Sequence, residues 1–266
     1  MPPPAKTLRP IRPNASVRLR FQRSLEALID EMWKSCLYWL TAQYRATPPK
    51  TMASDENAAK ALEREMRRLG TQWEARFDEL ARQMAKRFTD AAGRHSDAAL
   101  MDALKGAGFS VKWKMTPAMQ EAMAATIEQQ VGLIRTIPQE FLSDVQGLVM
   151  RSVQTGRDIG TLTTDLHQRY DITRRRAAFI ARDQNSKATA TLTRVRQSEA
   201  GITKARWLHS AAGKKPRPEH VAFSKGRLGG PIYDVAKGAY LENRWTWPGY
   251  EINCRCVSVP VVEGFT

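Results

Sequence analysis

The sequence predicts an α+β protein: a mostly helical N-terminal region followed by a small, loop-rich α+β C-terminal module. Three observations predict this class. Apolar residues recur at steps of three and four over most of residues 16–155, as on one face of a helix. That period disappears after Gly201, where short alternating or β-branched stretches begin. Glycine and proline are frequent between those stretches, so loops connect them.

The chain divides into three parts by composition. Residues 1–15 contain five prolines, which lack the backbone N–H that helices and sheets require. A flexible, basic, proline-rich arm is therefore predicted there. Residues 16–155 are expected to form a helical domain, and residues 156–266 a separate C-terminal domain.

The helical region is expected to begin with two long amphipathic helices. The first covers residues 17–44 and ends before Pro48 and Pro49. The second begins near Ser54 and is interrupted by Gly93. Shorter helices are expected at residues 96–105, 116–135, 138–154, 158–170 and 173–198. Gly201 closes the last of them. Strands are expected at residues 204–210, 231–235 and 252–262.

The formal charge of +15 is unevenly distributed. Residues 1–23 hold six basic and no acidic side chains, and residues 151–217 hold 15 basic against 5 acidic ones. Concentrated positive charge attracts polyanions by releasing their counterions, without regard to sequence. DNA, RNA or an acidic protein surface would fit, and a solvated basic surface with no dedicated partner is the alternative.

The expected helix at residues 173–198 carries much of this charge beside its apolar face. We expect its cations to contact double-stranded DNA non-specifically. These residues are Arg174, Arg175, Arg176, Lys187, Arg194 and Arg196. A sequence-specific regulator is disfavoured, because no helix-turn-helix partner of the usual length accompanies this helix.

The C-terminal part carries short motifs in a defined order. They are Gly156, Ile159 and Leu162, Ile180-Ala181-Arg182, Arg206-Trp207, Arg217-Pro218-Glu219-His220, Pro248-Gly249, Asn253-Cys254-Arg255-Cys256 and Pro260. The order resembles the C-terminal domain of the phage Mu F-like, or head-morphogenesis, family. The Asn-Cys-Arg-Cys ending downstream of Arg-Pro-x-His is its most specific part. The resemblance covers about residues 156–262.

The resemblance implies a minor capsid protein that acts in head morphogenesis and has no enzymatic activity of its own. It implies the portal protein, a scaffold or the major capsid protein as partners, together with packaged double-stranded DNA. The implied location is the virion interior, reached from the host cytoplasm during assembly. Structural roles are implied for Arg182, Trp207, Arg217, His220, Asn253, Cys254, Arg255 and Cys256. The sequence departs from the family by reading Arg182-Asp183-Gln184 where relatives have Arg-Thr-Glu.

A metal site is the sharpest alternative for the terminal motif. Cys254 and Cys256 are two residues apart, so on a strand they face the same side, and His220 could join them to hold zinc. A structural zinc normally has four ligands, and His209 is the one plausible fourth. We therefore expect no metal or other cofactor, with the cysteines packing as small apolar residues.

Arginines and tryptophans are expected to hold the loop-rich module together. Arg182, Arg217 and Arg255 can brace it through carboxylates, with phosphate binding as the alternative. The expected carboxylate partners are Asp183, Asp234 and Glu251. The expected core tryptophans are Trp207, Trp245 and Trp247.

Two further classes are weighed against the capsid protein. A hydrolase or nuclease would use His220 or His209 with Asp234, Glu219 or Glu251, yet no motif of the required order is present. A membrane protein is also not expected. The most apolar window, residues 24–40, is interrupted by four charged side chains.

Overall fold

The computed structural model describes residues 5–46, 55–156, 158–212 and 215–263. The chain forms two compact units. The first contains Met1–Arg18, Lys86–Ile127 and Arg182–Thr266, and the second contains Leu19–Ala85 and Glu128–Ala181. Four long helices contribute residues to both units.

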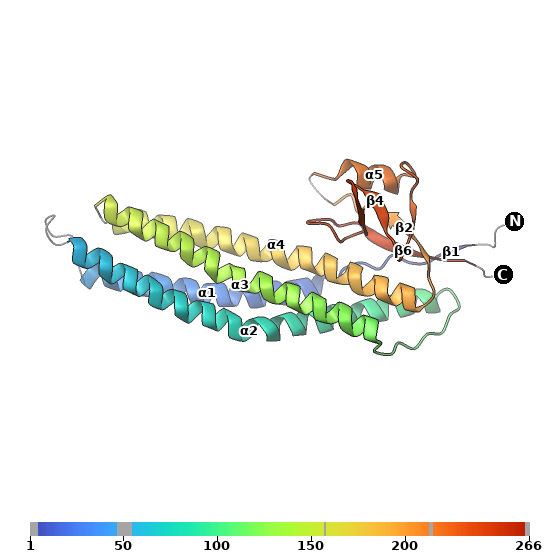
Figure 1. Ribbon diagram of the computed structural model, residues 1–266, viewed down its shortest axis with the longest axis horizontal. Helices are drawn as coiled ribbons and strands as arrows, with labels where there is room; N and C mark the ends of the chain where they lie inside the picture. Colours follow the sequence, from blue (N-terminus) through green and yellow to red (C-terminus); the bar gives the residue numbers. More distant parts are fainter. Residues whose placement is uncertain (1–4, 47–54, 157, 213–214, 264–266) are drawn as a thin grey trace. The chain divides into compact units, whose positions relative to one another are not determined.

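Five helices and six strands make up the described chain (Figure 1). The helices are α1 (Ala15–Ala46), α2 (Asp55–Lys105), α3 (Pro117–Gln154), α4 (Ile159–Glu199) and α5 (Pro218–Ser224). The strands are β1 (Lys6–Thr7), β2 (Lys204–Leu208), β3 (Ile232–Asp234), β4 (Ala239–Leu241), β5 (Arg244–Thr246) and β6 (Val257–Val262). The predicted α+β class, helical first and with strands near the C-terminus, is confirmed. None of the described helices is long and apolar enough to cross a bilayer.

The second unit packs helical segments of α1, α2, α3 and α4 around an apolar core that includes Leu25, Leu69 and Phe141, all with no exposed surface. Polar contacts link neighbouring segments at the rim. The Tyr170 hydroxyl of α4 donates to Asp30 of α1 at 2.7 Å. The amphipathic period predicted a helix at residues 17–44, and α1 confirms it.

The helices are longer than expected. Separate helices were predicted on either side of Pro138, and again on either side of Gly93, but α3 runs through the proline and α2 through the glycine. The reason is burial. Ile134, Ile137 and Phe141 continue one buried stripe across Pro138, and this packing outweighs the lost backbone hydrogen bond. Residues 158–170 and 173–198 likewise form the single helix α4.

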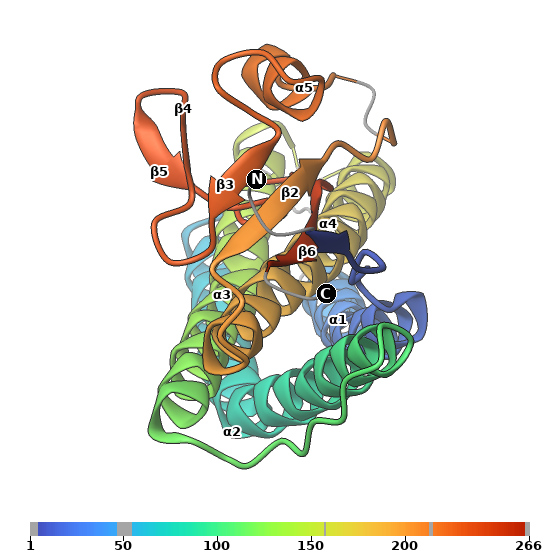
Figure 2. The same ribbon diagram turned by 90° about the vertical axis from the view of Figure 1, so that its right-hand side faces the viewer.

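The first unit contains a four-stranded sheet in the order β1-β6-β2-β3, shown in Figure 2, and a separate β4-β5 hairpin. Every neighbouring pair in the sheet is antiparallel. The strands expected at residues 204–210 and 231–235 are confirmed as β2 and β3. Of residues 252–262, only Val257–Val262 forms a strand, because Asn253 turns the chain with a φ of 59°.

The prediction of a flexible arm at residues 1–15 is wrong for residues 5–15, which the structure describes. Lys6 and Thr7 pair with Val262 and Val261 of β6, and the Leu8 N–H donates to the Pro260 carbonyl at 2.9 Å. Leu8 and Ile11 are buried in a cluster that includes Leu100, Leu104 and Ile202. Burial of these two apolar residues anchors the segment despite its prolines. Residues 1–4 lie outside the described chain.

A second core of this unit surrounds Trp207, which has no exposed surface. The rings of His220, Phe223 and Tyr233 lie edge-on to the indole at centroid distances of 4.9, 5.8 and 6.0 Å. Trp207 is therefore the core residue that the sequence predicted. Trp247 packs partly buried against the same core. Trp245 is 56% exposed, so the expectation that it is a core residue is wrong.

Candidate functional site

One cysteine–histidine cluster joins α5 to the segment before β6. His220 is on α5, and Cys254 and Cys256 directly precede β6, where all three side chains are buried. The His220 Nδ1 is 3.6 Å from the Cys254 sulfur and 3.9 Å from the Cys256 sulfur. The three potential ligand atoms lie within 4.8 Å of one another. The structure thus brings together the residues that the sequence marked as an alternative zinc site.

The pKa values of the two thiols in this cluster are shifted in opposite directions. Hydrogen bonds from Cys256, from His220 and from the backbone N–H groups of Cys256 and Gly249 lower the pKa of Cys254, against the opposing effect of burial. The hydrogen bond to Cys254, and then burial, raise the pKa of Cys256.

The residue expected as a fourth zinc ligand, His209, is placed differently. His209 lines the same small cavity beside the cluster, but its Nδ1 accepts the backbone N–H of Ala211 at 3.1 Å. It does not belong to the group of three close ligand atoms found in the described residues. The expectation that His209 would be a fourth ligand therefore has no support in this geometry.

Asn253 and Asp183 connect the Asn-Cys-Arg-Cys motif to the Arg182-Asp183-Gln184 motif on α4. The backbone of Asn253 has a left-handed φ of 59°, a conformation that asparagine tolerates better than most residues. Its N–H donates to the Asp183 carboxylate on α4 at 2.5 Å, and that carboxylate also pairs with Lys187 at 3.0 Å. Asp183, at which the sequence departs from the family motif, thus supplies the carboxylate that accepts the Asn253 N–H at the start of the Asn-Cys-Arg-Cys turn.

Arg217 braces the module, as the sequence predicted, although through other partners. Its Nε bonds to Glu242 at 3.0 Å, and its Nη1 bonds to the Ile252 carbonyl at 3.1 Å. The predicted bracing partners are used elsewhere. Asp234 accepts the backbone N–H groups of Ala236 and Lys237, which closes a turn between β3 and β4.

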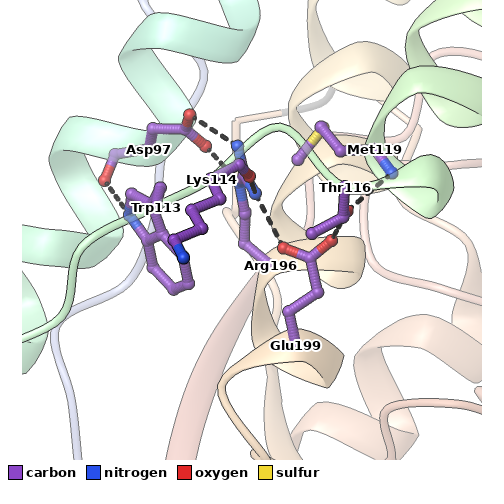
Figure 3. Close-up of polar contacts among 7 residues, drawn as sticks. All are labelled: Asp97, Trp113, Lys114, Thr116, Met119, Arg196 and Glu199. Atoms are coloured by element: carbon purple, nitrogen blue, oxygen red, sulfur yellow. Dashed lines mark hydrogen bonds and ion pairs between the residues drawn. The ribbon is translucent and has the colours of Figure 1, made fainter.

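Arg196, one of the cations expected to contact DNA, is buried in the first unit with 2% of its side chain exposed. Figure 3 shows it between Asp97 and Glu199. Two guanidinium nitrogens bond to the Asp97 carboxylate at 2.7 and 3.0 Å, and a third bonds to Glu199 and to the Lys114 carbonyl, each at 2.7 Å. A buried, fully engaged guanidinium holds the fold together and cannot contact DNA in this conformation.

Four of the other five expected DNA contacts also have partners. Arg194 stacks on the Trp247 ring at 4.1 Å, and burial lowers its pKa. Lys187 pairs with Asp183. In the second unit, Arg174 pairs with Glu26 and Arg176 with Glu140, whereas Arg175 is exposed. Five of the six cations thus have internal partners, and DNA binding by this set stays a prediction.

Four other arginines converge on one pocket of about 480 Å³ in the first unit. They are Arg12, Arg18, Arg182 and Arg255. Burial, and then the nearby charges of Arg255 and Arg18, lower the pKa of Arg182. The Nη1 of Arg255 donates to the Ala212 carbonyl at 2.6 Å, while its buried Nε has no acceptor among the described residues. Guanidinium groups gathered this closely favour an anion between them.

The acids of the alternative hydrolase are occupied in local contacts. Glu219 accepts the backbone N–H of Glu242 at 2.5 Å, and Glu251 accepts the Thr246 hydroxyl at 3.0 Å. None of these acids joins His220 in a group of close ligand atoms within the described chain. Among the described residues, Glu219 and Glu251 thus have local partners other than His209 and His220.

Sequence reasoning missed two contributors to these sites. Arg12 and Arg18 appeared only as members of a basic N-terminal segment, because the sequence does not reveal which distant residues they approach. Their signal was the charge itself, six cations with no acid over residues 1–23. Asp183 was expected as a carboxylate partner of a bracing arginine, and not as an acceptor for a backbone N–H. Its role depends on the backbone N–H of Asn253, 70 residues away.

Comparison with known proteins confirms the resemblance of the C-terminal part. A family model described as "Phage Mu protein F like protein" matches residues 143–259. An uncharacterized protein of Haemophilus influenzae is 33% identical over 161 residues, which is 59% of this chain and 33% of the relative. The chain therefore spans about a third of the length of that relative. No solved structure matches the chain significantly.

Proposed function

We propose, from the match of residues 143–259 to the Phage Mu F-like family, that the chain is a minor head protein. In this role it acts in head morphogenesis, is carried inside the virion, and contacts the portal and the packaged DNA. It has no catalytic role. The family match is the observation that carries the proposal, and an arginine-lined pocket of the first unit supports the contact with DNA.

The contact with DNA is assigned to the four-arginine pocket. Arg182 and Arg255 approach it from α4 and from the turn before β6, and Arg12 and Arg18 approach it from the N-terminal segment. Phosphate diesters offer pairs of oxygens that match the planar guanidinium fork. A pocket of this kind binds the backbone of any duplex without reading its sequence. This fits a protein that must tolerate every segment of a packaged genome.

The distribution of charge favours the four-arginine pocket as the DNA contact over the cations predicted on residues 173–198. The nearest acid to Arg182 along the chain, Asp183, is already engaged by Lys187 and by the Asn253 N–H. The described residues that line the pocket include four arginines and no acid, which gives the lining a positive charge. Arg174, Arg176 and Arg196, in contrast, lie against carboxylates that offset them. A polyanion would have to displace those ion pairs first.

We expect the full chain to bind duplex DNA with an affinity that falls steeply between about 50 and 200 mM salt. The double substitution Arg182→Gln/Arg255→Gln should weaken binding roughly ten- to a hundred-fold, because two phosphate contacts are lost. It should also reduce the slope of log affinity against log salt by about 2. Fluorescence anisotropy with two labelled duplexes of different base composition measures both quantities.

The matched control is Arg67→Gln/Arg76→Gln, which removes the same charge from exposed sites on α2. It should change the affinity by less than about three-fold. Equal losses in the two double variants would assign binding to overall charge and contradict the pocket. A wild-type chain that captures portal subunits but binds no DNA would show that the pocket serves an acidic protein surface. Melting curves of each variant establish that it remains folded.

A further inference from the structure

The cysteine–histidine cluster has a geometry that side-chain packing alone does not explain. A neutral imidazole Nδ1 can accept one S–H donor, yet the Nδ1 of His220 lies 3.6 and 3.9 Å from two sulfurs. Tetrahedral zinc, with bonds of about 2.3 Å to sulfur and about 2.0–2.1 Å to nitrogen, places a nitrogen and a sulfur ligand about 3.6 Å apart. Both observed separations are close to that edge of the tetrahedron.

The surroundings of the sulfurs also favour a metal. Backbone N–H groups of Cys256 and Gly249 are directed at the Cys254 sulfur, and that of Ser210 is directed at the Cys256 sulfur. Such N–H donors stabilise the negative charge of metal-bound thiolates. The edge-on contact with the fully buried Trp207 fixes the orientation of the His220 ring. The donor set is therefore positioned before any ion arrives.

A small cavity adjoins the cluster and leaves room for a fourth ligand. It has a volume of about 60 Å³ and is lined by the three cluster residues together with His209, Arg217 and Ser210. One water molecule occupies about 30 Å³ in the liquid, so the cavity accommodates one or two. Two sulfurs and one imidazole nitrogen form a soft donor set that selects zinc over magnesium or calcium.

We propose that His220, Cys254 and Cys256 bind one Zn²⁺ ion, with water from the adjoining cavity as the fourth ligand. The ion joins α5 to the segment before β6, two elements of a small module whose described connections are mostly loops and short strands. Because it bridges these elements, the bound metal stabilises the folded module over the unfolded chain. The inference is independent of head assembly and of the arginine pocket.

The test measures zinc in the full-length chain, purified under reducing conditions and dialysed after loading with Zn²⁺. We expect about one zinc per chain by elemental analysis, and the same stoichiometry in Cys36→Ala, which removes a buried cysteine outside the cluster. Cys254→Ser and Cys256→Ser should retain less than about a tenth of the wild-type zinc. Chelator should lower the melting temperature of the wild type and of Cys36→Ala, but not that of Cys254→Ser.

A second measurement needs no variant. Titration of the metal-free wild-type chain with Co²⁺ should give the visible absorption of tetrahedral cobalt with thiolate ligands, saturating at one equivalent. Absence of that absorption, or a wild-type zinc content near zero, would overturn the proposal. Zinc retained equally by Cys254→Ser and Cys256→Ser, each still folded by circular dichroism, would place the metal elsewhere and overturn it as well.

Discussion

Trp207→Ala is expected to lower the free energy of unfolding of the C-terminal module by about 3–5 kcal/mol, the range for truncating a buried aromatic side chain. The indole has no exposed surface and contacts the rings of His220, Phe223 and Tyr233. Alanine would leave a cavity that these three rings cannot fill without moving. Denaturant unfolding followed by circular dichroism measures the loss.

The control for this substitution is Trp245→Ala. Trp245 is 56% exposed and contacts Tyr240 at a centroid distance of 5.5 Å, so its loss should cost less than about 1 kcal/mol. The comparison separates burial from residue type, because the same side chain is removed in both variants. Unfolding curves that coincide for Trp207→Ala and the wild type would show that Trp207 does not organise the core of this module.

Asp97→Ala is expected to cost about 3 kcal/mol, because it leaves the buried Arg196 without its bidentate partner. The cost should fall at the lower end of the range for breaking a buried ion pair, since Glu199 and the Lys114 carbonyl still bond to the guanidinium. Within the first unit, the network connects α2, the residues just before α3, and α4 (Figure 3). Chemical denaturation of the purified variant gives the value.

Asp90→Ala serves as the matched control, because it breaks an exposed ion pair with Lys86 on the same helix. Exposed pairs of this spacing contribute less than about 1 kcal/mol. A third variant, Asp97→Ala/Arg196→Leu, should recover part of the stability by removing the unpaired charge. If Asp97→Ala cost no more than Asp90→Ala, the buried network would not stabilise the unit in the way described.

Periodicity predicted where helices form, but not how far they continue. The stripe around Leu25 and Ile29 located α1 correctly, because apolar spacing reports burial directly. Pro138 and Gly93 carry local signals that end helices in isolation. In the folded chain, buried neighbours on both sides of each residue keep the helix intact. Local propensity was outweighed by tertiary packing, which a single sequence does not display.

Long-range partners were the other part that the sequence did not reveal. Nothing in residues 6–7 indicates that they pair with β6, about 250 residues away. The charge count likewise located the basic segments but not their partners. It therefore treated the buried Arg196 and the exposed Arg175 as equivalent cations. Solvent exposure and ion pairing depend on the fold, so charge alone overestimated the surface available to DNA.

The residues of the cysteine–histidine cluster were predicted better from the sequence than helix lengths or long-range partners were. The two-residue spacing placed Cys254 and Cys256 together, and the resemblance singled out His220. What required coordinates was the distance from one imidazole nitrogen to both sulfurs, which changes the favoured interpretation from simple packing to a metal site. The sequence offered His209 as a plausible fourth ligand, but its Nδ1 accepts the backbone N–H of Ala211.

If the chain is a minor head protein, as proposed above, it should be found in purified phage particles. Virions of the phage that encodes the chain would be separated into heads and tails, and the heads into DNA-filled and DNA-free fractions. Quantitative peptide mass spectrometry should find the chain in heads, at a copy number well below that of the major capsid protein, and not in tails. Particles that lack the chain, or that carry it only in tails, would contradict the account.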